Sequence, residues 1–132
     1  MSFLLDAHTL LWAILDQKKL SSKVTGILEN PVNDIFVSSV TFWEISLKYS
    51  LGKLDLSGIS PEELPGLSNE TGFKFLPLLP HESASYHQIN SDLHRDPFDR
   101  MLIWQAIKND LTLLSMDKNV AQYKSIGLKL IW

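Results

Sequence analysis

Residues 3–12 read FLLDAHTLLW, and this stretch decides how the fold begins. Its first three residues form a short apolar run without polar alternation, which is typical of a strand buried on both faces of a parallel sheet. The run ends at Asp6, and apolar residues then recur at helical spacing as far as Leu15. The stretch therefore predicts a buried strand, an acid at its carboxyl end and a helix that follows at once.

The same alternation of apolar run and helical pattern continues along the chain. Further strands are expected at residues 35–37, 73–76, 111–114 and 128–131, and helices at residues 40–51, 82–90, 97–109 and 117–123, with a short one through 27–28. Residues 54–72 are punctuated by Gly and Pro and predict short helices and loops. Alternating strands and helices predict an α/β fold, with helices on both faces of a central parallel sheet of four to five strands.

Length and composition favour a single globular domain over residues 1–132. Hydrophobic residues make up 45% of the chain and charged residues 20%, which is ordinary for a folded domain. The absence of cysteine excludes disulfides, zinc–thiolate sites and cysteine nucleophiles, and fits a cytoplasmic protein. No apolar stretch is long enough to span a membrane, and the N-terminus lacks the basic segment of a signal peptide.

Four acids stand where a parallel sheet places its ligands. Asp6 follows the first expected strand, Glu44 lies just inside the helix after the second, and Asp117 follows the fourth. Asp99 begins the helix that leads into the fourth strand. Ligands of open parallel sheets bind beyond the carboxyl ends of the strands, so these acids are candidates for one shared site. They converge only if the strand order brings those ends together.

Each acid also has an alternative, purely structural interpretation. Thr41 and Glu44 have the spacing of a capping box, in which the acid returns to a backbone N–H. Asp96 precedes Pro97 as an N-cap precedes a proline at the first helical position, and Asp99 fits the reciprocal acid of that helix start. In the same way, the acid after the first strand can end it in an Asx turn, and the acid after the fourth can cap a short helix.

A carboxylate cluster at that edge has a definite chemistry. Carboxylate oxygens are hard ligands that suit Mg²⁺ or Mn²⁺, and such ions activate water and stabilise charge at a phosphorus centre. Clustered acids without a cation repel one another and raise each other's pKa values. Glu44 has apolar neighbours on most sides of its helix, so we expect its carboxylate to need compensation and a metal ion to stabilise the fold.

Four motifs resemble those of PIN-domain proteins of the VapC-like toxin group, in the same order along the chain. They are FLLDAHTLLW at residues 3–12, VSSVTFWEI at 37–45, HRDPFDRMLI at 94–103 and LLSMD at 113–117, followed by the closing LKLIW at 128–132. The third motif is the most specific. The resemblance implies a three-layer α/β/α PIN-like domain and a Mg²⁺- or Mn²⁺-dependent ribonuclease. It also implies a homodimer and a small cognate antitoxin that blocks the active site.

Carried over by motif, the resemblance assigns four catalytic and metal-binding acids: Asp6, Glu44, Asp99 and Asp117. Asp96, Arg100, His94 and Ser115 are further candidates for supporting the acids or touching substrate, and Asp96 also fits a helix cap alone. The chain departs from the family pattern at Ala7, where Thr or Ser is frequent, and at Ser115, where Thr is frequent. Neither departure removes an acid, so we expect activity to be retained.

The charge balance limits how RNA can be recognised. The net charge is −3, from 15 acidic and 12 basic residues. Setting aside the four proposed ligands leaves 11 acids against 12 bases, a balance of +1, which is compatible with RNA but gives no broad basic surface. Recognition would therefore be local. Trp12, Trp43 and Trp104 can stack on bases, but their helical spacing favours packing in the core or at a dimer interface.

Three other functions compete with the ribonuclease. A phosphotransferase of the haloacid dehalogenase type needs a second acid two residues after the first, and that position is His8. A receiver domain needs an acid after the third strand, which here ends in Leu76 and Pro77. A catalytically degenerate PIN-like module that only binds RNA or a partner would explain the fold, but the four retained acids favour activity.

Overall fold

Five parallel strands form one sheet in the order β3-β2-β1-β4-β5. The computed structural model describes residues 1–89 and 96–132. The strands are β1 (Ser2–Leu5), β2 (Asp34–Ser38), β3 (Lys74–Leu76), β4 (Thr112–Leu114) and β5 (Lys129–Ile131). Every neighbouring pair runs parallel, which confirms the predicted α/β fold with a central parallel sheet.

Helices fill the connections between the strands. They are α1 (Ala7–Leu15), α2 (Ser22–Glu29), α3 (Ser39–Ser50), α4 (Leu64–Glu70), α5 (Pro80–Ser85) and α6 (Pro97–Lys108), with short 3-10 segments η1 (Gln17–Lys19), η2 (Pro61–Glu63), η3 (Tyr86–Gln88) and η4 (Val120–Ile126). Two expected helices differ from the prediction. The helix expected over 82–90 is divided into α5 and η3, with residue 90 outside the described part, and the helix expected over 117–123 is the 3-10 segment η4. In the described ranges, no helix has the length and apolar character needed to cross a bilayer.

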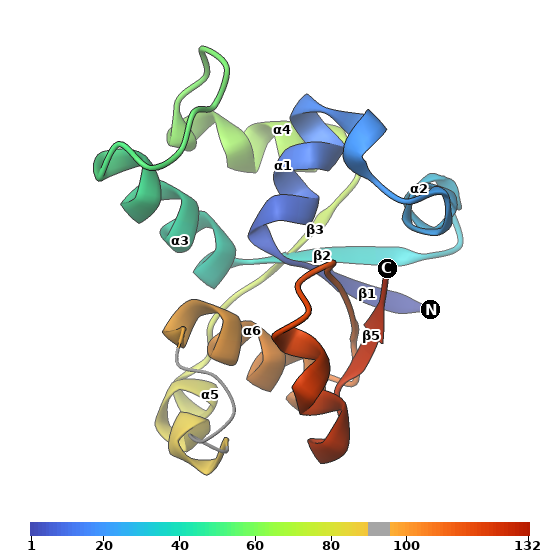
Figure 1. Cartoon of the computed structure of the whole chain (residues 1–132), viewed down its shortest axis with the longest axis vertical. Helices are drawn as coiled ribbons and strands as arrows, with labels where there is room; N and C mark the ends of the chain where they lie inside the picture. Colours follow the sequence, from blue (N-terminus) through green and yellow to red (C-terminus); the bar gives the residue numbers. More distant parts are fainter. Residues whose placement is uncertain (90–95) are drawn as a thin grey trace.

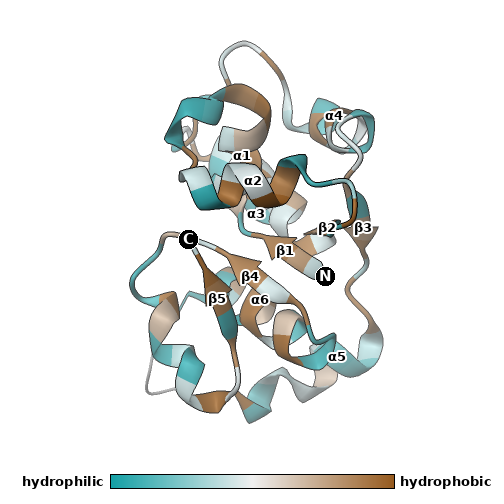
Figure 2. Cartoon of the chain, turned by 90° about the vertical axis from the view of Figure 1, so that its right-hand side faces the viewer, coloured by the Kyte–Doolittle hydropathy of each residue, from teal (hydrophilic) through white to brown (hydrophobic). Residues whose placement is uncertain are grey.

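The sheet separates two hydrophobic cores. Phe3 and Leu5 of β1 face the core beneath α1 and α2, whereas Leu4 faces the core around α6. This alternation is the period of two that a strand imposes on its side chains. Figure 1 shows α1 to α4 in one half of the molecule and α5, α6 and the C-terminal segment in the other, and Figure 2 shows the apolar strands between these two layers.

Several helices begin with a polar cap where a strand or loop ends. Asp6 caps α1, Ser21 caps α2, Ser38 caps α3 and Asp96 caps α6, each by accepting a backbone N–H of the first turn. Two of these caps, Asp6 and Ser38, lie at the carboxyl ends of neighbouring strands. The start of α1 and the start of α3 are therefore fixed at the same edge of the sheet.

Candidate active site

The strand order places the predicted acids at one edge of the sheet. β1 lies between β2 and β4, and all three run parallel. Asp6 follows β1, α3 with Glu44 follows β2, and Asp117 comes shortly after β4. The connection direction reverses between β1 and β4, which is the position where open α/β sheets bind ligands. α6, which carries Asp99, packs against α3.

Three acids form a cluster compact enough for one cation. Among residues 1–89 and 96–132, Glu44, Asp96 and Asp99 each offer a carboxylate oxygen within 4.8 Å of the others. Glu44 is buried, and the other two are half-buried. Asp96 was predicted only as a possible supporting residue or a cap, so its place within this cluster was not anticipated.

Glu44 lies at the buried end of this cluster. Its residue is 4% exposed, and Oε1 is buried without a hydrogen-bond partner. Oε2 accepts a hydrogen bond of 2.5 Å from the ammonium of Lys48, one turn further along α3. Burial raises the pKa of Glu44 above its usual value; the Lys48 hydrogen bond opposes this, and the nearby charges of Asp99 and Asp96 add to the rise.

The pKa of Lys48 reflects the same surroundings. Burial acts to lower it, but the hydrogen bond to Glu44 and the negative charges of Glu44, Asp96 and Asp99 outweigh burial and raise the pKa above its usual value. The ammonium therefore stays charged at neutral pH. The ammonium of Lys48 therefore interacts electrostatically with all three acids of the cluster.

The capping-box interpretation of Glu44 is wrong. α3 begins at Ser39, so Thr41 and Glu44 both lie inside the helix, and Ser38 is the N-cap through a 3.0 Å hydrogen bond from the Val40 N–H. The carboxylate of Glu44 instead pairs with a side chain on the following turn. Helix capping therefore does not explain why the Glu44 carboxylate is buried.

Asp96 combines a cap with a position in the acidic cluster. Its Oδ1 accepts hydrogen bonds from the N–H groups of Phe98, at 2.9 Å, and Asp99, at 3.2 Å, which confirms the predicted N-cap. These bonds fix the first turn of α6 and hold Asp99 at the helix start, where the helix dipole favours negative charge. Asp96 thus caps α6 through Oδ1, and one of its carboxylate oxygens lies within 4.8 Å of one each from Glu44 and Asp99.

Asp6 is held rigidly at the end of β1. Its Oδ1 accepts hydrogen bonds from the Thr9 N–H, at 2.9 Å, and from the Thr9 hydroxyl, at 2.7 Å. The same hydroxyl lies 2.9 Å from the carbonyl oxygen of Leu114 on β4. Thr9 therefore ties the acid to the neighbouring strand. The sequence contained a signal for this residue, because Thr9 follows the acid by three positions, the spacing of an N-cap contact.

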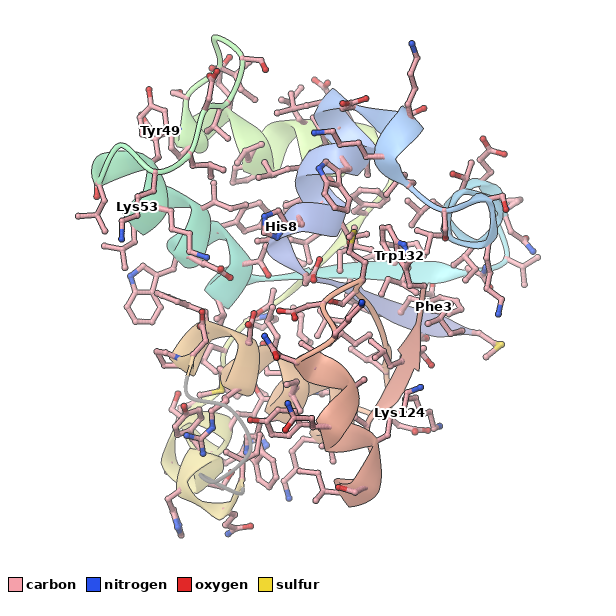
Figure 3. All side chains as sticks on the ribbon, in the orientation of Figure 1. Phe3, His8, Tyr49, Lys53, Lys124 and Trp132 are labelled. Atoms are coloured by element: carbon pink, nitrogen blue, oxygen red, sulfur yellow. The ribbon has the colours of Figure 1, made fainter. Side chains whose placement is uncertain are left out.

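Asp6, which follows β1, and Asp117, which follows β4, line the same hollow. The hollow has a volume of about 310 Å³, and its other walls are His8, Trp12 and Met116. Figure 3 shows His8 at the base of α1, between α1 and α3. Neither Asp6 nor Asp117 belongs to the compact group of three acids. The predicted acids are thus divided: Glu44 and Asp99 belong to the compact group, whereas Asp6 and Asp117 line the hollow.

Ser115 contributes to the position of Asp117. It is buried, and its hydroxyl accepts a 3.1 Å hydrogen bond from the Asp117 N–H. The Asp117 carboxylate in turn accepts a 2.9 Å bond from the Asn119 N–H. This loop bond is not the helix cap considered for Asp117, because Asn119 is the N-cap residue of η4 and no side chain caps that segment.

Arg100 contacts residues of the neighbouring segment η3 and its end. Its Nη2 donates a 3.1 Å hydrogen bond to the carbonyl oxygen of Ile89, and its guanidinium lies 5.0 Å from the ring centre of Tyr86. These contacts join α6 to the end of η3. His94, the other flanking candidate, lies outside the described residues.

A buried polar network beneath α3 was missed by sequence reasoning. Gln105 of α6 is fully buried; its Oε1 accepts a 2.5 Å bond from the Ser38 hydroxyl, and its Nε2 donates to Glu82 at 3.1 Å. Glu82 also accepts hydrogen bonds from the Leu79 N–H and the Asn109 amide. The network links α5 and α6 to the cap of the helix that carries the buried acid.

The pKa of Glu82 is lowered although its side chain is buried. Burial acts to raise the pKa, but the hydrogen bonds from Leu79, Asn109 and Gln105 together hold it below the usual value. Glu82 is therefore ionised at neutral pH and fully hydrogen-bonded. This distinguishes it from Glu44, which has one oxygen without a partner.

Comparison with known proteins identifies the family of the chain. Residues 3–126 match the family model of the PIN domain, so the chain belongs to the PIN-domain family, whose members are generally nucleases. Among curated proteins, none matches the sequence significantly.

Two solved structures share the fold over almost the whole chain. One is a chain of VapBC2 from Rickettsia felis bound to a DNA fragment from their promoter, with 17% identity, a TM-score of 0.66 and coverage of 99% of this chain and 98% of that one. The other is a chain of FitAB bound to the IR36 DNA fragment, with 19% identity, a TM-score of 0.62 and coverage of 99% and 94%.

Proposed function

We propose that the chain is a metal-dependent ribonuclease that hydrolyses RNA phosphodiester bonds with Mg²⁺ or Mn²⁺. The observation that carries this proposal is the Glu44 carboxylate, which is buried beside Asp96 and Asp99 with one oxygen that has no hydrogen-bond partner. A buried carboxylate is costly unless a cation or hydrogen bonds compensate it. A divalent cation would satisfy this oxygen and reduce the repulsion among the three acids.

The residues at the edge fit such an ion. All donors are carboxylate oxygens, the ligand type preferred by Mg²⁺ and Mn²⁺. We propose that Glu44 and Asp99 hold it, that Asp6 and Asp117 complete the catalytic set, and that Asp96 supports them from the helix cap. When bound, the ion would lower the pKa of a water molecule and stabilise charge on the phosphate oxygens.

The chain's own residues would orient the substrate and the acids. Thr9 fixes Asp6, and Ser115 fixes the backbone at Asp117, so both carboxylates are held toward the hollow that they line. His8 and Trp12 give that hollow an aromatic wall, with ring centres 5.6 Å apart. An aromatic wall beside the acids suits a nucleotide base, because stacking on aromatic side chains is tolerant of sequence.

The proposed biological setting rests on the resemblance to VapC-like toxins. We propose a toxin that acts in the cytoplasm as one domain over residues 1–132 and is inhibited by a cognate antitoxin. The names VapBC2 and FitAB each denote a pair of proteins, which supports a protein partner for this chain. An acidic pocket suits inhibition by a basic antitoxin side chain placed among the carboxylates.

A homodimer is supported by an exposed apolar stripe along α3 and its C-cap residue Leu51. Trp43, Leu47 and Leu51 recur every four residues and are 61%, 40% and 58% exposed. Trp43 also borders an apolar hollow of about 230 Å³ together with Phe98 and Met101. Contiguous apolar surface of this kind marks an interaction site in soluble proteins, and we propose that a second copy of the chain covers it.

The test is cleavage of an RNA panel with Mg²⁺, with Mn²⁺ and with chelator. We expect metal-dependent cleavage by the wild type and none by Glu44→Gln or Asp99→Asn. Asp110→Asn is the matched control, because Asp110 is exposed and pairs with Lys129 far from the cluster. RNA binding without cleavage under every metal condition would instead favour the degenerate PIN-like module, which binds RNA or a partner only.

A further inference from the structure

The side chain of Lys48 contacts Glu44, the buried member of the acidic cluster. It lies one turn after Glu44 on α3, and its ammonium contacts Glu44 Oε2 at 2.5 Å. The Lys48 side chain is 37% exposed, whereas that of Glu44 is 5% exposed. A partly exposed cation thus neutralises a carboxylate that solvent hardly reaches. Pairs at this helical spacing are usually exposed and weak, so the burial of the acid sets this pair apart.

A positive charge of the chain itself lies against this group of carboxylates. Lys48 forms an ion pair with Glu44, and one carboxylate oxygen of Glu44 lies within 4.8 Å of one each from Asp96 and Asp99. Without this ammonium, Glu44 would be a buried carboxylate with neither of its oxygens bonded to a side chain.

We propose that Lys48 is a competing counter-ion of the metal site, which pairs with the buried Glu44 carboxylate until a divalent cation replaces it. This inference rests on the metal-dependent function proposed above. An ammonium and a divalent cation repel each other strongly at a shared carboxylate. The Lys48 side chain can leave, because its flexible four-carbon stem already reaches solvent. The chain would then fold without metal, and would bind metal less tightly than its acids alone allow.

The alternative role of Lys48 is to orient Glu44 for the metal. It would hold Oε2 and present Oε1, and its ammonium would stay in place when the ion binds. The two roles predict opposite effects of removing the ammonium. Loss of a competitor tightens metal binding, whereas loss of an orienting contact weakens it.

Calorimetric titration with Mn²⁺ separates these roles. We expect Lys48→Met to bind Mn²⁺ about tenfold more tightly than the wild type, because a nearby positive charge is removed. Lys48→Arg retains the charge and should bind as the wild type does. Lys53→Met removes an exposed lysine just beyond the end of α3 and should change nothing.

Thermal melting gives a second measurement that does not depend on activity. With chelator, Lys48→Met should melt at a lower temperature than the wild type, because Glu44 has lost its counter-ion. At saturating Mn²⁺ this difference should shrink, since the ion then compensates the same carboxylate. Lys48→Arg should show neither change.

The outcomes distinguish this inference from the proposed function. Equal or weaker Mn²⁺ binding by Lys48→Met, with normal binding by the wild type, would overturn the role of Lys48 alone. No Mn²⁺ binding by the wild type would overturn both. If Lys48→Met does not fold, the ¹⁵N resonance of the Lys48 ammonium in wild-type protein decides: we expect Mg²⁺ to shift it toward that of a free lysine, and an unchanged resonance would overturn the inference.

Discussion

Replacing Gln105 with leucine tests whether the buried polar network positions the acidic edge. Gln105 is fully buried and hydrogen-bonds to Ser38, Glu82 and the carbonyl oxygen of Pro77. Leucine has a similar size but neither donates nor accepts. Gln105→Leu therefore removes three hydrogen bonds at once without leaving a large cavity. Its effect on the free energy of unfolding measures mainly what those buried hydrogen bonds contribute.

The magnitude follows from the groups left without partners. The Ser38 hydroxyl loses its acceptor, and Glu82 loses one of the hydrogen bonds to its carboxylate. A buried polar group left unsatisfied costs about 1–3 kcal/mol, and a hydrogen bond to a charged group is worth about 1.5–3 kcal/mol. Because neighbouring losses do not add fully, we expect about 2–4 kcal/mol, a large part of the roughly 5–15 kcal/mol that stabilises a domain.

Urea unfolding measures this change directly. With a slope of about 2 kcal/mol/M, the midpoint should fall by about 1–2 M. Gln122→Leu is the matched control, because Gln122 is exposed on η4 and its replacement should stay within about 0.5 kcal/mol. A Gln105→Leu midpoint equal to that of the control would refute the reasoning, because the network would then contribute nothing to the free energy of unfolding.

The same variant connects stability with the proposed metal site. Ser38 caps α3 while donating to Gln105, and α3 carries Glu44. We therefore expect Gln105→Leu to bind Mn²⁺ more weakly as well, at a temperature where the variant is fully folded. Lower stability with unchanged Mn²⁺ affinity would mean that the network supports the fold without positioning the acid.

Three further predictions concern single side chains. Thr9→Val should lower RNA cleavage and destabilise the fold by about 1–3 kcal/mol, because the Asp6 carboxylate loses a buried hydroxyl donor; Thr9→Ser should restore both, and equal behaviour of the two variants would contradict this role. The pKa of Glu82 is lower in the folded state than its usual 4.5, so its contribution to stability is complete above about pH 4.5 and is lost as the pH falls through the folded-state pKa. Urea unfolding of wild type and Glu82→Gln should therefore differ most at neutral pH and converge in acid; a gap independent of pH would exclude this linkage. Trp43→Lys should convert a dimer into a folded monomer in light scattering, while Val32→Lys, at another exposed apolar residue, should not; a monomeric wild type would rule out the dimer.

Much of the fold could be read from the sequence because parallel strands buried on both faces produce short apolar runs. Phe3 to Leu5 and Ile35 to Val37 predicted strands that the structure extends by one residue at one or both ends. The C-terminal 3-10 segment was harder to predict. Residues 120–126 are too few to show whether their apolar spacing has the period of an α-helix or of the tighter 3-10 helix.

The position of each acid along the chain was readable, but the distances between them were not. Asp6 and Asp117 follow strands β1 and β4, and only the strand order shows that these strands are neighbours. The approach of Asp96 to Glu44 depends on how α6 packs against α3, which no local pattern encodes. Local spacing predicted the cap formed by Asp96, because a cap involves residues two and three positions away.

The pair of Glu44 and Lys48 shows most clearly why the remaining part required the structure. Its four-residue spacing is visible in the sequence, and such pairs usually lie in solvent and contribute about 0.3–0.5 kcal/mol. The apolar neighbours of Glu44 predicted that its carboxylate is buried, but not that it lies beside Asp96 while the ammonium of Lys48 reaches solvent. That asymmetry sets this pair apart from an exposed one, because loss of the ammonium would leave the buried carboxylate without its counter-ion. A divalent ion is the replacement that three carboxylates favour, so the same contact that stabilises the fold without metal is expected to limit metal affinity.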